Sequence, residues 1–432
     1  MGNAAIPHWY EPKHEPDTFV EGEGARVYND EGEEYLDFVS QLYCVNAGHS
    51  QQHIVDAMTE QAEKIPYVSS GSRNPQRDRL ARRLTEKAPP NMSNVVFSIS
   101  GSEANETAMQ IVRDYQDAPK ILTRWRSYHG ATYGAGALTG EPSTRTVLEK
   151  HSAASGHAKF LPPLDFCGPF DADTPEELGE QAADHLEWVI RNEGPDSIAA
   201  LFTEPIAGSS GAYPAPPGYF DRVREICDEH DILLVADEVI TGFGRCGEWF
   251  GVQTEDLQPD VITFAKGVTS SYAPLAGAIV SEELGDYLER EGLPVGQTFA
   301  GHPVSCAAAN AAMDVYGDGL IRNVRDLEGH LESHLRELEE FPKVAEVRGR
   351  GFLWSVDFGD PDAEDNAFLF DPRVDEGDNP IETLREHAHD RGVVFGAGRP
   401  DTQVLICPPL CATREEIDEA VDVLAESIDA TF

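Results

Sequence analysis

The sequence predicts an α/β fold, in which a mostly parallel sheet carries helices on both faces. Two observations lead to this prediction: from about residue 94 onward short apolar runs alternate with longer amphipathic stretches, and each run stays apolar along its whole length. A strand that is apolar on both sides needs cover on both faces, as in parallel sheets. The expected strands are 94–99, 120–123, 198–203, 232–236, 261–265 and 277–280. A helix is expected over 103–115.

The two chain ends are expected to build a second, smaller unit. A chain of 432 residues exceeds what one hydrophobic core usually supports. Hairpin-like and helical patterns lie before and after the alternating region. We therefore expect a large domain over 61–325 and a smaller α+β domain formed jointly by 1–60 and 326–432.

The charge balance excludes several classes of partner. The chain has 77 acidic and 33 basic residues, a net charge of −44, and the acidic residues are spread along its length. Such a surface repels nucleic acid and anionic membranes. Dispersed carboxylates with only eight lysines are typical of a surface that works in molar salt, where screening removes the self-repulsion. We expect a halophilic protein.

Cysteine usage and hydropathy indicate the compartment. The seven cysteines include no CxxC pair, which suits reduced thiols better than disulfides or a metal site. No run approaches about 18 apolar residues, so no membrane span is expected. We expect a soluble cytoplasmic protein without a metal.

Ligands of open α/β sheets bind beyond the carboxyl ends of the strands, so the residues that close each run are the first candidates. These are Ser100-Gly101-Ser102, Glu204, Asp237 and Lys266. A lysine forms a Schiff base with a carbonyl cofactor when it is partly desolvated, and Lys266 closes an apolar run. No other lysine lies between Lys159 and Lys343. The alternative is a surface lysine at a strand end.

Two further groups of residues at predicted strand ends complete a site for pyridoxal 5′-phosphate (PLP). The ring nitrogen of PLP stays protonated only beside a carboxylate, and Asp237 supplies one; an N-cap or a core salt bridge is the alternative. Ser100-Gly101-Ser102 joins a strand to a helix and exposes N–H groups to a phosphate. The same letters also satisfy an ordinary serine N-cap, with Glu103 three residues later.

One motif favours a different class of protein. Gly242-Phe243-Gly244-Arg245-Cys246-Gly247 matches the dinucleotide fingerprint G-x-G-x-x-G. Five residues separate it from the preceding apolar run, and the aromatic, glycine-broken segment 248–252 follows it in place of a helix pattern. We interpret the match as coincidental, with a nicotinamide-dependent oxidoreductase as the remote alternative.

The assembled motifs resemble those of class III, or omega-type, aminotransferases of PLP fold type I. The matching segments are Ser98–Ala108, Tyr128–Gly130, Thr203–Pro205, Ala236–Val239, Gly242–Arg245, Lys266 and Thr298–Pro303. The resemblance covers most of the chain.

The resemblance implies a role for each cofactor contact. Gly101 and Ser102 would hold the phosphate, Tyr128 would stack on the ring, and Val239 would pack on its opposite face. Asp237 would pair with the ring nitrogen.

It also implies a shared active site. Thr298 would reach the phosphate of the neighbouring subunit, so the protein would be a homodimer or a tetramer. Glu204 would belong to a polar network beside the cofactor and Asp237. Lys266 would move the proton between substrate and cofactor, and ping-pong kinetics would follow.

Substrate residues are the least specified. Arg399 resembles the movable arginine that clamps a substrate carboxylate, and an ordinary surface arginine is the alternative. Leu42 and Tyr43 occupy the segment where such enzymes place pocket residues; core packing is the alternative for Tyr43. Ser209 stands where ornithine and 4-aminobutyrate members carry glutamate, which favours pyruvate as the acceptor.

We therefore expect an aminotransferase that moves an amino group from an amine or omega-amino acid to a keto acid such as pyruvate. On the same fold, a dialkylglycine-type decarboxylating transaminase or an aminomutase is the alternative. A non-catalytic PLP-binding protein is a third possibility.

Overall fold

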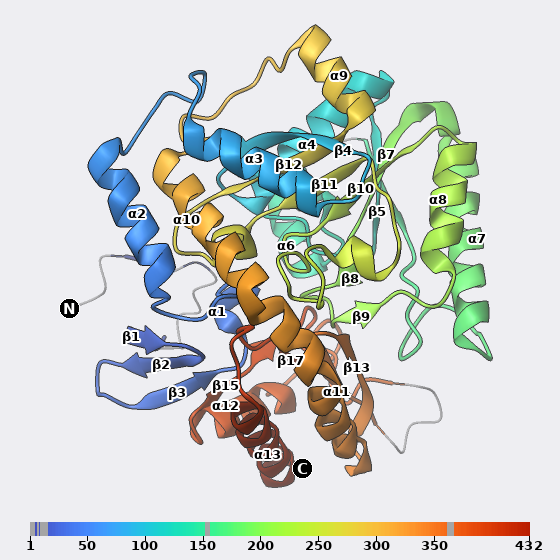
Figure 1. Cartoon of the computed structure of the whole chain (residues 1–432). Helices are drawn as coiled ribbons and strands as arrows, with labels where there is room; N and C mark the ends of the chain where they lie inside the picture. Colours follow the sequence, from blue (N-terminus) through green and yellow to red (C-terminus); the bar gives the residue numbers. More distant parts are fainter. Residues whose placement is uncertain (1–4, 7, 9–15, 152–155, 361–366) are drawn as a thin grey trace.

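A seven-stranded sheet forms the centre of the protein in the computed structural model (Figure 1). The residues described are 5–6, 8, 16–151, 156–360 and 367–432. In spatial order the strands are β4 (Met92–Ser98), β12 (Ala276–Ser281), β11 (Val261–Phe264), β10 (Leu233–Asp237), β7 (Ile198–Thr203), β5 (Lys120–Arg124) and β6 (His157–Phe160). The predicted strands are all present, and β6 is an edge strand that the sequence pattern did not indicate.

The direction of the strands brings the candidate residues to one edge. The pairs β5·β6, β5·β7, β7·β10 and β10·β11 are parallel, while β12 is antiparallel to both β11 and β4. Because β12 alone reverses, β4 runs in the same direction as β11. The carboxyl ends of β4, β7, β10 and β11 therefore share one edge.

Register places these ends side by side. Asp237 on β10 pairs with Thr263 on β11, three residues before Lys266. On the other side, Ala236 pairs with Thr203 on β7, so Glu204 follows directly next to Asp237.

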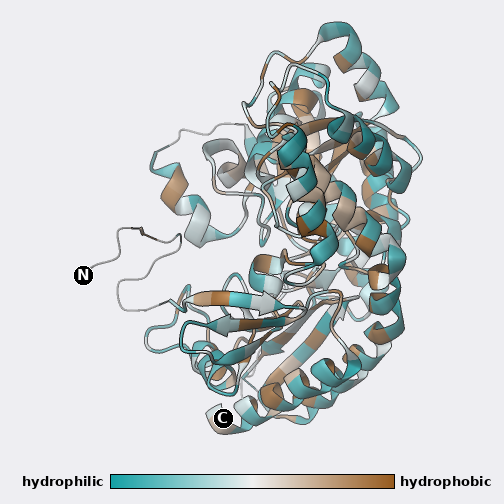
Figure 2. Ribbon diagram, turned by 60° about the vertical axis from the view of Figure 1, so that its left-hand side comes forward, coloured by the Kyte–Doolittle hydropathy of each residue, from teal (hydrophilic) through white to brown (hydrophobic). Residues whose placement is uncertain are grey.

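Both faces of the sheet are buried, as the continuous apolar runs predict. Successive residues of one strand enter different hydrophobic clusters: Leu234 packs in one, and Val235 packs in the other. Helix α4 (Gly101–Gln116) covers the Val235 face with Ala108, Ile111 and Val112. The Leu234 face is covered by α3 (Pro75–Lys87), α7 (Pro175–Glu193), α8 (Tyr219–Glu229) and α10 (Pro303–Val315). Figure 2 shows the apolar residues gathered on the strands and inner helix faces.

Segments from the two chain ends lie together below this sheet (Figure 1). One four-stranded sheet contains β1 (Phe19–Glu23), β2 (Arg26–Asn29), β3 (Glu34–Asp37) and β15 (Val393–Val394). A second contains β13 (Val344–Arg350), β14 (Leu353–Phe358), β17 (Gln403–Ile406) and β16 (Gly396–Ala397). Helices α11 (Ile321–Glu337), α12 (Pro380–His389) and α13 (Arg414–Thr431) accompany them. The parallel pair of Val393 with Leu36 joins the ends directly; the domain boundaries near 60 and 325 stay a prediction.

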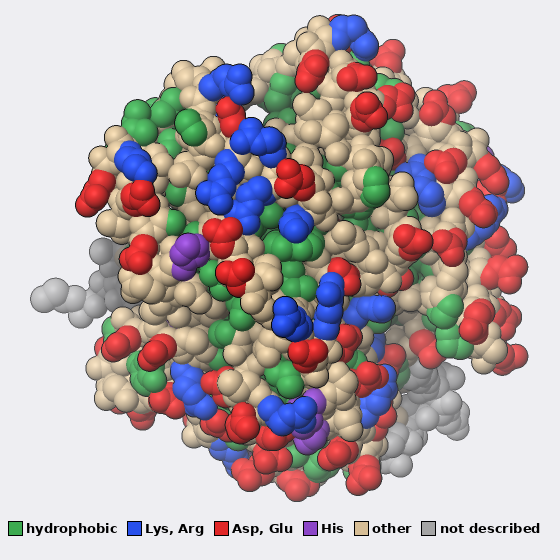
Figure 3. Space-filling view, in the orientation of Figure 1, with side chains coloured by type: hydrophobic (Ala, Val, Ile, Leu, Met, Phe, Trp, Pro, Cys, Tyr) green, Lys and Arg blue, Asp and Glu red, His purple; other side chains and the backbone are tan. Residues whose placement is uncertain are grey.

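Acidic side chains cover much of the visible surface, and basic ones gather in a few groups (Figure 3). Among the described residues, no helix is both long enough and apolar enough to cross a membrane.

Candidate active site

Lys266 directly follows the predicted strand 261–265, two residues after the observed end of β11 at Phe264, and begins the short turn Lys266–Thr269. Its backbone has φ +46°, in the left-handed region that non-glycine residues rarely occupy. The side chain lines a cavity of about 160 Å³, and burial lowers the pKa of its amine. The lysine is therefore the desolvated one that the sequence predicts.

Asp237 lies in the same cavity and is held by a buried hydrogen-bond network. Its Oδ2 lies 2.8 Å from His129 Nδ1 and accepts a hydrogen bond from Asn105 Nδ2, also at 2.8 Å. Its Oδ1 accepts from the backbone N–H of Val239 at 3.1 Å. A second hydrogen bond fixes Asn105, whose Oδ1 accepts from the Thr263 hydroxyl at 2.8 Å. The carboxylate is thus oriented by three neighbours, and Thr263 on β11 in turn holds one of them, Asn105.

His129 and Asn105 are the residues of this network to which the sequence analysis assigned no role. Both side chains are buried, and the Nε2 atom of His129 has no hydrogen-bond partner among the described residues. A buried histidine next to the predicted ring-stacking residue Tyr128, and an asparagine inside a buried helix face, are polar groups that need partners. The need of these two buried polar side chains for hydrogen-bond partners is the sequence signal that could have identified them.

The start of α4 satisfies both interpretations of its sequence. The Ser100 hydroxyl accepts from the backbone N–H of Glu103 at 3.3 Å, as in an N-cap. Ser102 Oγ accepts from the backbone N–H of Ala131 at 3.1 Å, and Gly101 and Ser102 line the cavity. A Cβ on Gly130 would lie 2.4 Å from Ser102 Oγ, so glycine permits this close approach of loop and helix. The N-cap therefore forms while Gly101 and Ser102 still line the cavity, and their binding of a phosphate stays a prediction.

Glu204 holds the loop that carries Tyr128. Its carboxylate accepts from the backbone N–H of Tyr128 at 3.1 Å and of Gly208 at 2.7 Å. Burial raises the pKa of Glu204. Glu204, Tyr128 and Val239 all line the Lys266 cavity, so seven of the eight predicted cofactor contacts come together there, and Thr298 is the exception.

Tyr43 also lies near the lysine. Its ring centroid is 5.4 Å from Lys266 Nζ, and its hydroxyl donates to the carbonyl of Ala397 at 3.2 Å. Ser40, Gln41 and Tyr43 all have positive φ, and such strain is concentrated at functional sites. Leu42, by contrast, is half exposed and does not line the Lys266 cavity.

Arg399 lies against Tyr128, with its guanidinium carbon 5.1 Å from the centroid of the tyrosine ring. Its backbone N–H donates to the carbonyl of Ser209 at 2.8 Å. The backbone of Ser209, which stands where some related enzymes carry glutamate, therefore contacts the backbone of Arg399.

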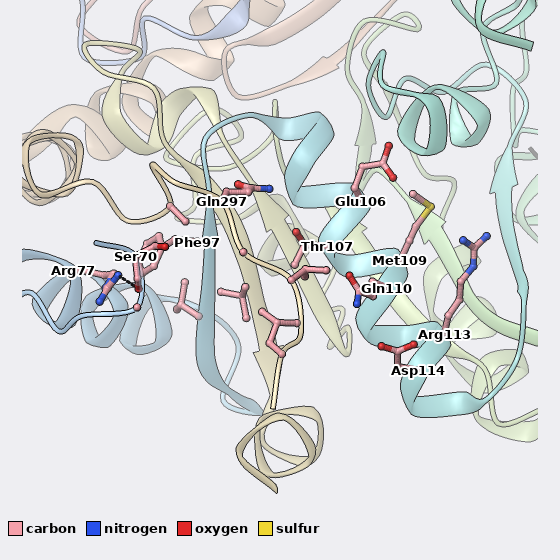
Figure 4. A pocket seen from close by; sticks show the side chains of 17 residues that line it. Ser70, Arg77, Phe97, Glu106, Thr107, Met109, Gln110, Arg113, Asp114 and Gln297 are labelled. Carbon is pink, nitrogen blue, oxygen red and sulfur yellow. Dashed lines mark hydrogen bonds between the residues drawn. The ribbon is translucent and has the colours of Figure 1, made fainter. Parts of the chain in front are cut away.

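Thr298 does not line the Lys266 cavity of its own chain. It is exposed, and its carbonyl accepts from the Tyr67 hydroxyl at 3.1 Å. A larger cavity of about 850 Å³ lies beside it, between α4 and the segment that contains Gln297. Figure 4 shows Glu106, Gln110 and Asp114 on the α4 side of this cavity, with Ser70 and Arg77 opposite. This cavity is the larger of the two, yet it lacks the lysine and its carboxylate.

The glycine fingerprint forms a buried turn and no nucleotide-binding helix. Arg245 in its middle is fully buried and donates to the carbonyl of Phe352 at 3.1 Å and to Asn46 Oδ1 at 3.0 Å. The segment after Gly247 is irregular and leads to the short 3-10 turn Gly251–Thr254. A fingerprint needs a helix N-terminus at this point to receive the pyrophosphate.

These residues fit PLP. A Cβ on Gly101 would lie 3.1 Å from both methyl groups of Val239, so the helix start and the valine form a cradle that any larger residue would narrow. The N-terminus of α4, the held carboxylate of Asp237 and the desolvated Lys266 line the same cavity. These are the partners that the phosphate, the ring nitrogen and the aldehyde of PLP require.

The comparisons with known proteins agree with this chemistry. The sequence model of the family described as aminotransferase class-III matches residues 9–428. The diaminobutyrate–2-oxoglutarate transaminase of Halomonas elongata is 34% identical over 422 residues, which cover 93% of this chain and 87% of that protein.

Solved structures agree as well. The taurine:2-oxoglutarate aminotransferase of Bifidobacterium kashiwanohense, in complex with PLP and glutamate, has a TM-score of 0.93 at 32% identity, covering 98% of this chain and 95% of that one. The PMP-bound aminotransferase of Vibrio fluvialis has a TM-score of 0.91 at 31% identity, covering 99% and 96%.

Fold and site together define a PLP-dependent transferase of fold type I. The chain belongs to the class III aminotransferase family, and its cofactor is pyridoxal 5′-phosphate. The fold class, enzyme class and cofactor predicted from the sequence are confirmed.

Proposed function

We propose that this enzyme is an omega-type aminotransferase that moves an amino group from an amine or omega-amino acid to a keto acid such as pyruvate. One observation carries the proposal: the desolvated Lys266 amine and the Asp237 carboxylate open into the same cavity. PLP, when bound, supplies an aldehyde that condenses with amines and a ring that accepts electrons from the substrate carbon.

We assign the cofactor contacts as follows. Gly101 and Ser102 at the start of α4 bind the phosphate, because the helix N-terminus presents N–H groups and positive dipole charge there. Tyr128 stacks on one face of the ring, and Val239 packs on the other. Asp237 accepts from the ring nitrogen, and its network keeps the carboxylate in place.

Lys266 serves as the acid–base group. Burial lowers the pKa of its amine, so at neutral pH a larger fraction is unprotonated than for an exposed lysine. An unprotonated amine at this place would take the proton from the substrate carbon and deliver it to the former aldehyde carbon of the cofactor. Glu204 acts on Tyr128 through the backbone and is a positioning residue.

The keto acid acceptor is supported by Ser209. Ser209 stands where ornithine and 4-aminobutyrate members carry glutamate, and its backbone carbonyl accepts from the Arg399 N–H at 2.8 Å. Two of the similar proteins are named for 2-oxoglutarate, so that acceptor belongs in every test beside pyruvate.

A half-reaction assay tests the proposal. Purified holoenzyme in molar potassium chloride is mixed with a panel of amines and omega-amino acids, and the cofactor absorbance is followed. Pyruvate, 2-oxoglutarate and glyoxylate are then added separately. We expect donor-dependent bleaching of the cofactor band and its return with a keto acid. Release of carbon dioxide would favour the decarboxylating alternative, turnover of one substrate alone would favour an aminomutase, and no change with any donor would contradict transamination.

We also propose that the enzyme works as a homodimer with shared active sites. Thr298 is exposed and lies outside the Lys266 cavity of its own chain, and Val295 and Phe299 beside it expose about half of their apolar side chains. Thr298 would contact the phosphate bound to a second copy.

Mixed dimers of Lys266→Ala and Thr298→Asp chains test the shared site. Each variant alone is expected to be inactive, since the aspartate repels the phosphate. In a mixed dimer one site carries both defects and the other carries none, so about half of the parental activity should return. Absence of recovery in a dimer of confirmed composition would contradict sharing.

Finally, we propose a cytoplasm of high salt as its setting. The net charge of −44 produces self-repulsion that molar salt screens. Dialysis to about 0.1 M salt should lower the unfolding temperature, and an unchanged temperature would contradict the proposal.

A further inference from the structure

A further cavity of about 230 Å³ adjoins the active site, and four arginines line it. We call it the outer arginine pocket and define it by Arg126, Arg145, Arg373 and Arg399. Arg126 lies in the loop after β5, Arg145 lies on α6 (Pro142–Glu149), and Arg399 lies between β16 and β17. Arg373 comes from the segment before α12. Four separate parts of the chain therefore supply one kind of charge to one place.

This gathering runs against the composition of the protein. Acidic residues outnumber basic ones by more than two to one, yet four arginines and a single acidic residue, Glu141, line this cavity. The Glu141 carboxylate is engaged in capping α6, where it accepts from the backbone N–H of Ser143 at 2.8 Å and of Thr144 at 3.0 Å. Like charges held close together raise the free energy of the empty site and favour a bound anion.

The arginines retain donors for such an anion. Arg126 donates from Nη2 to the carbonyl of Ser210 at 2.9 Å, and Arg145 donates from Nη1 to Glu149 at 2.7 Å. The other guanidinium nitrogens of these two residues have no hydrogen-bond partner among the described residues. Arg373 bonds Asp371 at its Nε and Nη2 atoms, which leaves Nη1. Burial lowers the pKa of Arg126, which reflects the cost of keeping this charge without a carboxylate in direct contact.

The pocket borders the cofactor cavity. Tyr128 lines the Lys266 cavity, and Arg399 lines the outer arginine pocket. The guanidinium carbon of Arg399 lies 5.1 Å from the centroid of the Tyr128 ring, so the two side chains are in contact. A substrate that reacts at Lys266 and extends past Tyr128 would bring its far end to the arginines.

We infer that the outer arginine pocket binds the terminal carboxylate of the amino donor. The preferred donor is then an omega-amino acid and not an amine that lacks a carboxylate. The inference rests on the proposed function and narrows its donor. Arginine is suited to the task because its planar fork binds carboxylates in two-point contact.

Matched donors test the inference. Each omega-amino acid from 3-aminopropanoate to 6-aminohexanoate is compared with the alkylamine in which a methyl group replaces the carboxylate. The rate of cofactor bleaching without acceptor is measured on holoenzyme at the lowest salt that keeps it folded. For at least one chain length we expect the carboxylate donor to react tenfold faster or more, because a charge-assisted hydrogen bond is retained only there.

Variants of the pocket give the second arm. Arg145→Gln and Arg373→Gln should each reduce the advantage of the carboxylate donor by about tenfold and leave the alkylamine rate within about twofold. Arg191→Gln on α7, an exposed arginine paired with Glu187, is the matched control and should change neither rate. The alkylamine rate also reports that each variant is folded and holds cofactor.

The outcomes separate the inference from the function on which it rests. Equal rates for matched donors at every length, or an advantage that survives both substitutions, would overturn the inference while transamination stands. A third outcome is that sulfate stabilises the parent but not the variants, while the parent shows no preference for carboxylate donors. This outcome would assign the pocket to a free inorganic anion and would also overturn the inference. No reaction with any amine at all would remove the proposed function itself.

Discussion

The Lys266 cavity and the outer arginine pocket lie side by side, but they are built in opposite ways. In the first, Asp237 is the last residue of the central strand β10, and its two carboxylate oxygens are held by His129, Asn105 and the Val239 backbone. In the second, three of the four arginines come from loops, and some donors of Arg126, Arg145 and Arg373 have no hydrogen-bond partner among the described residues. Both oxygens of the Asp237 carboxylate in the first region have hydrogen-bond partners, while the second region gathers four positive charges of which Arg145 and Arg373 are ion-paired, with Glu149 and Asp371.

The difference separates chemistry from specificity. Hydrogen bonds that fix a carboxylate next to the ring nitrogen serve every substrate alike, so they belong on the rigid sheet edge. A pocket that selects one end of a substrate needs donors left open for it, and loops on a rigid scaffold can supply them. Substitutions on the two sides should therefore have separable effects, and the following predictions test this.

The largest effect is expected for Lys266→Ala. Removal of the acid–base group should reduce the donor half-reaction by about 10³-fold or more, for carboxylate donors and alkylamines equally. Stopped-flow absorbance measures both rates, and Lys64→Ala, an exposed lysine of α2 (Gln52–Lys64), is the control. A loss confined to one donor class would break the division between chemistry and specificity.

Asp237→Asn should follow, with a loss of about 10²-fold in kcat. The asparagine carries no charge to keep the ring nitrogen protonated, and its amide would face the donor groups of Asn105 and His129. Asp228→Asn, whose side chain is exposed on α8, should retain full activity. Activity near the parental value would mean that Asp237 is a structural residue.

A smaller effect is expected for His129→Gln. The histidine touches Asp237 and acts as a positioning residue, so kcat should fall about tenfold, as for loss of one hydrogen bond to a charged group. The preference for carboxylate donors should stay unchanged, because the outer arginine pocket is intact. A changed donor preference would show that the two regions are coupled.

The smallest effect concerns Glu238, which follows Asp237 and accepts from the backbone N–H groups of Gly251 at 2.8 Å and Val252 at 2.7 Å. Burial raises the pKa of Glu238 from 4.5 to about 7. The folded state therefore favours the protonated carboxyl, and its contribution to stability is lost as the pH rises from about 4.5 through about 7. The full difference amounts to about 3 kcal/mol.

Thermal unfolding of the parent and of Glu238→Gln from pH 5 to pH 8 measures this contribution. The stability of the parent relative to the variant should decline as the pH rises. A constant difference would show that the carboxyl is ionised throughout.

Much of the cofactor side could be predicted from the sequence because it depends on short-range rules. The apolar runs predicted the strands. The residues at the carboxyl ends of these strands lie at one edge of the sheet, because β12 is antiparallel to both of its neighbours, β11 and β4. Lys266 and Asp237 were accessible in this way. Asn105 and His129 were not, since nothing local shows that two polar residues 24 positions apart both reach one carboxylate.

The outer arginine pocket could not be predicted at all. Its residues are separated by up to 273 positions, and each of them alone is an ordinary arginine in an acidic protein. Only the packing of α6 and the loops around it brings them together. Among these residues, the sequence singled out Arg399 by resemblance alone.

Borohydride reduction of the holoenzyme, followed by peptide mass mapping, tests the central claim most directly. We expect the reduced cofactor to be attached to Lys266 and to none of the other seven lysines, and prior incubation with a reactive donor to abolish the label. Attachment at another lysine, or a label on Lys266 that persists after every donor, would contradict it.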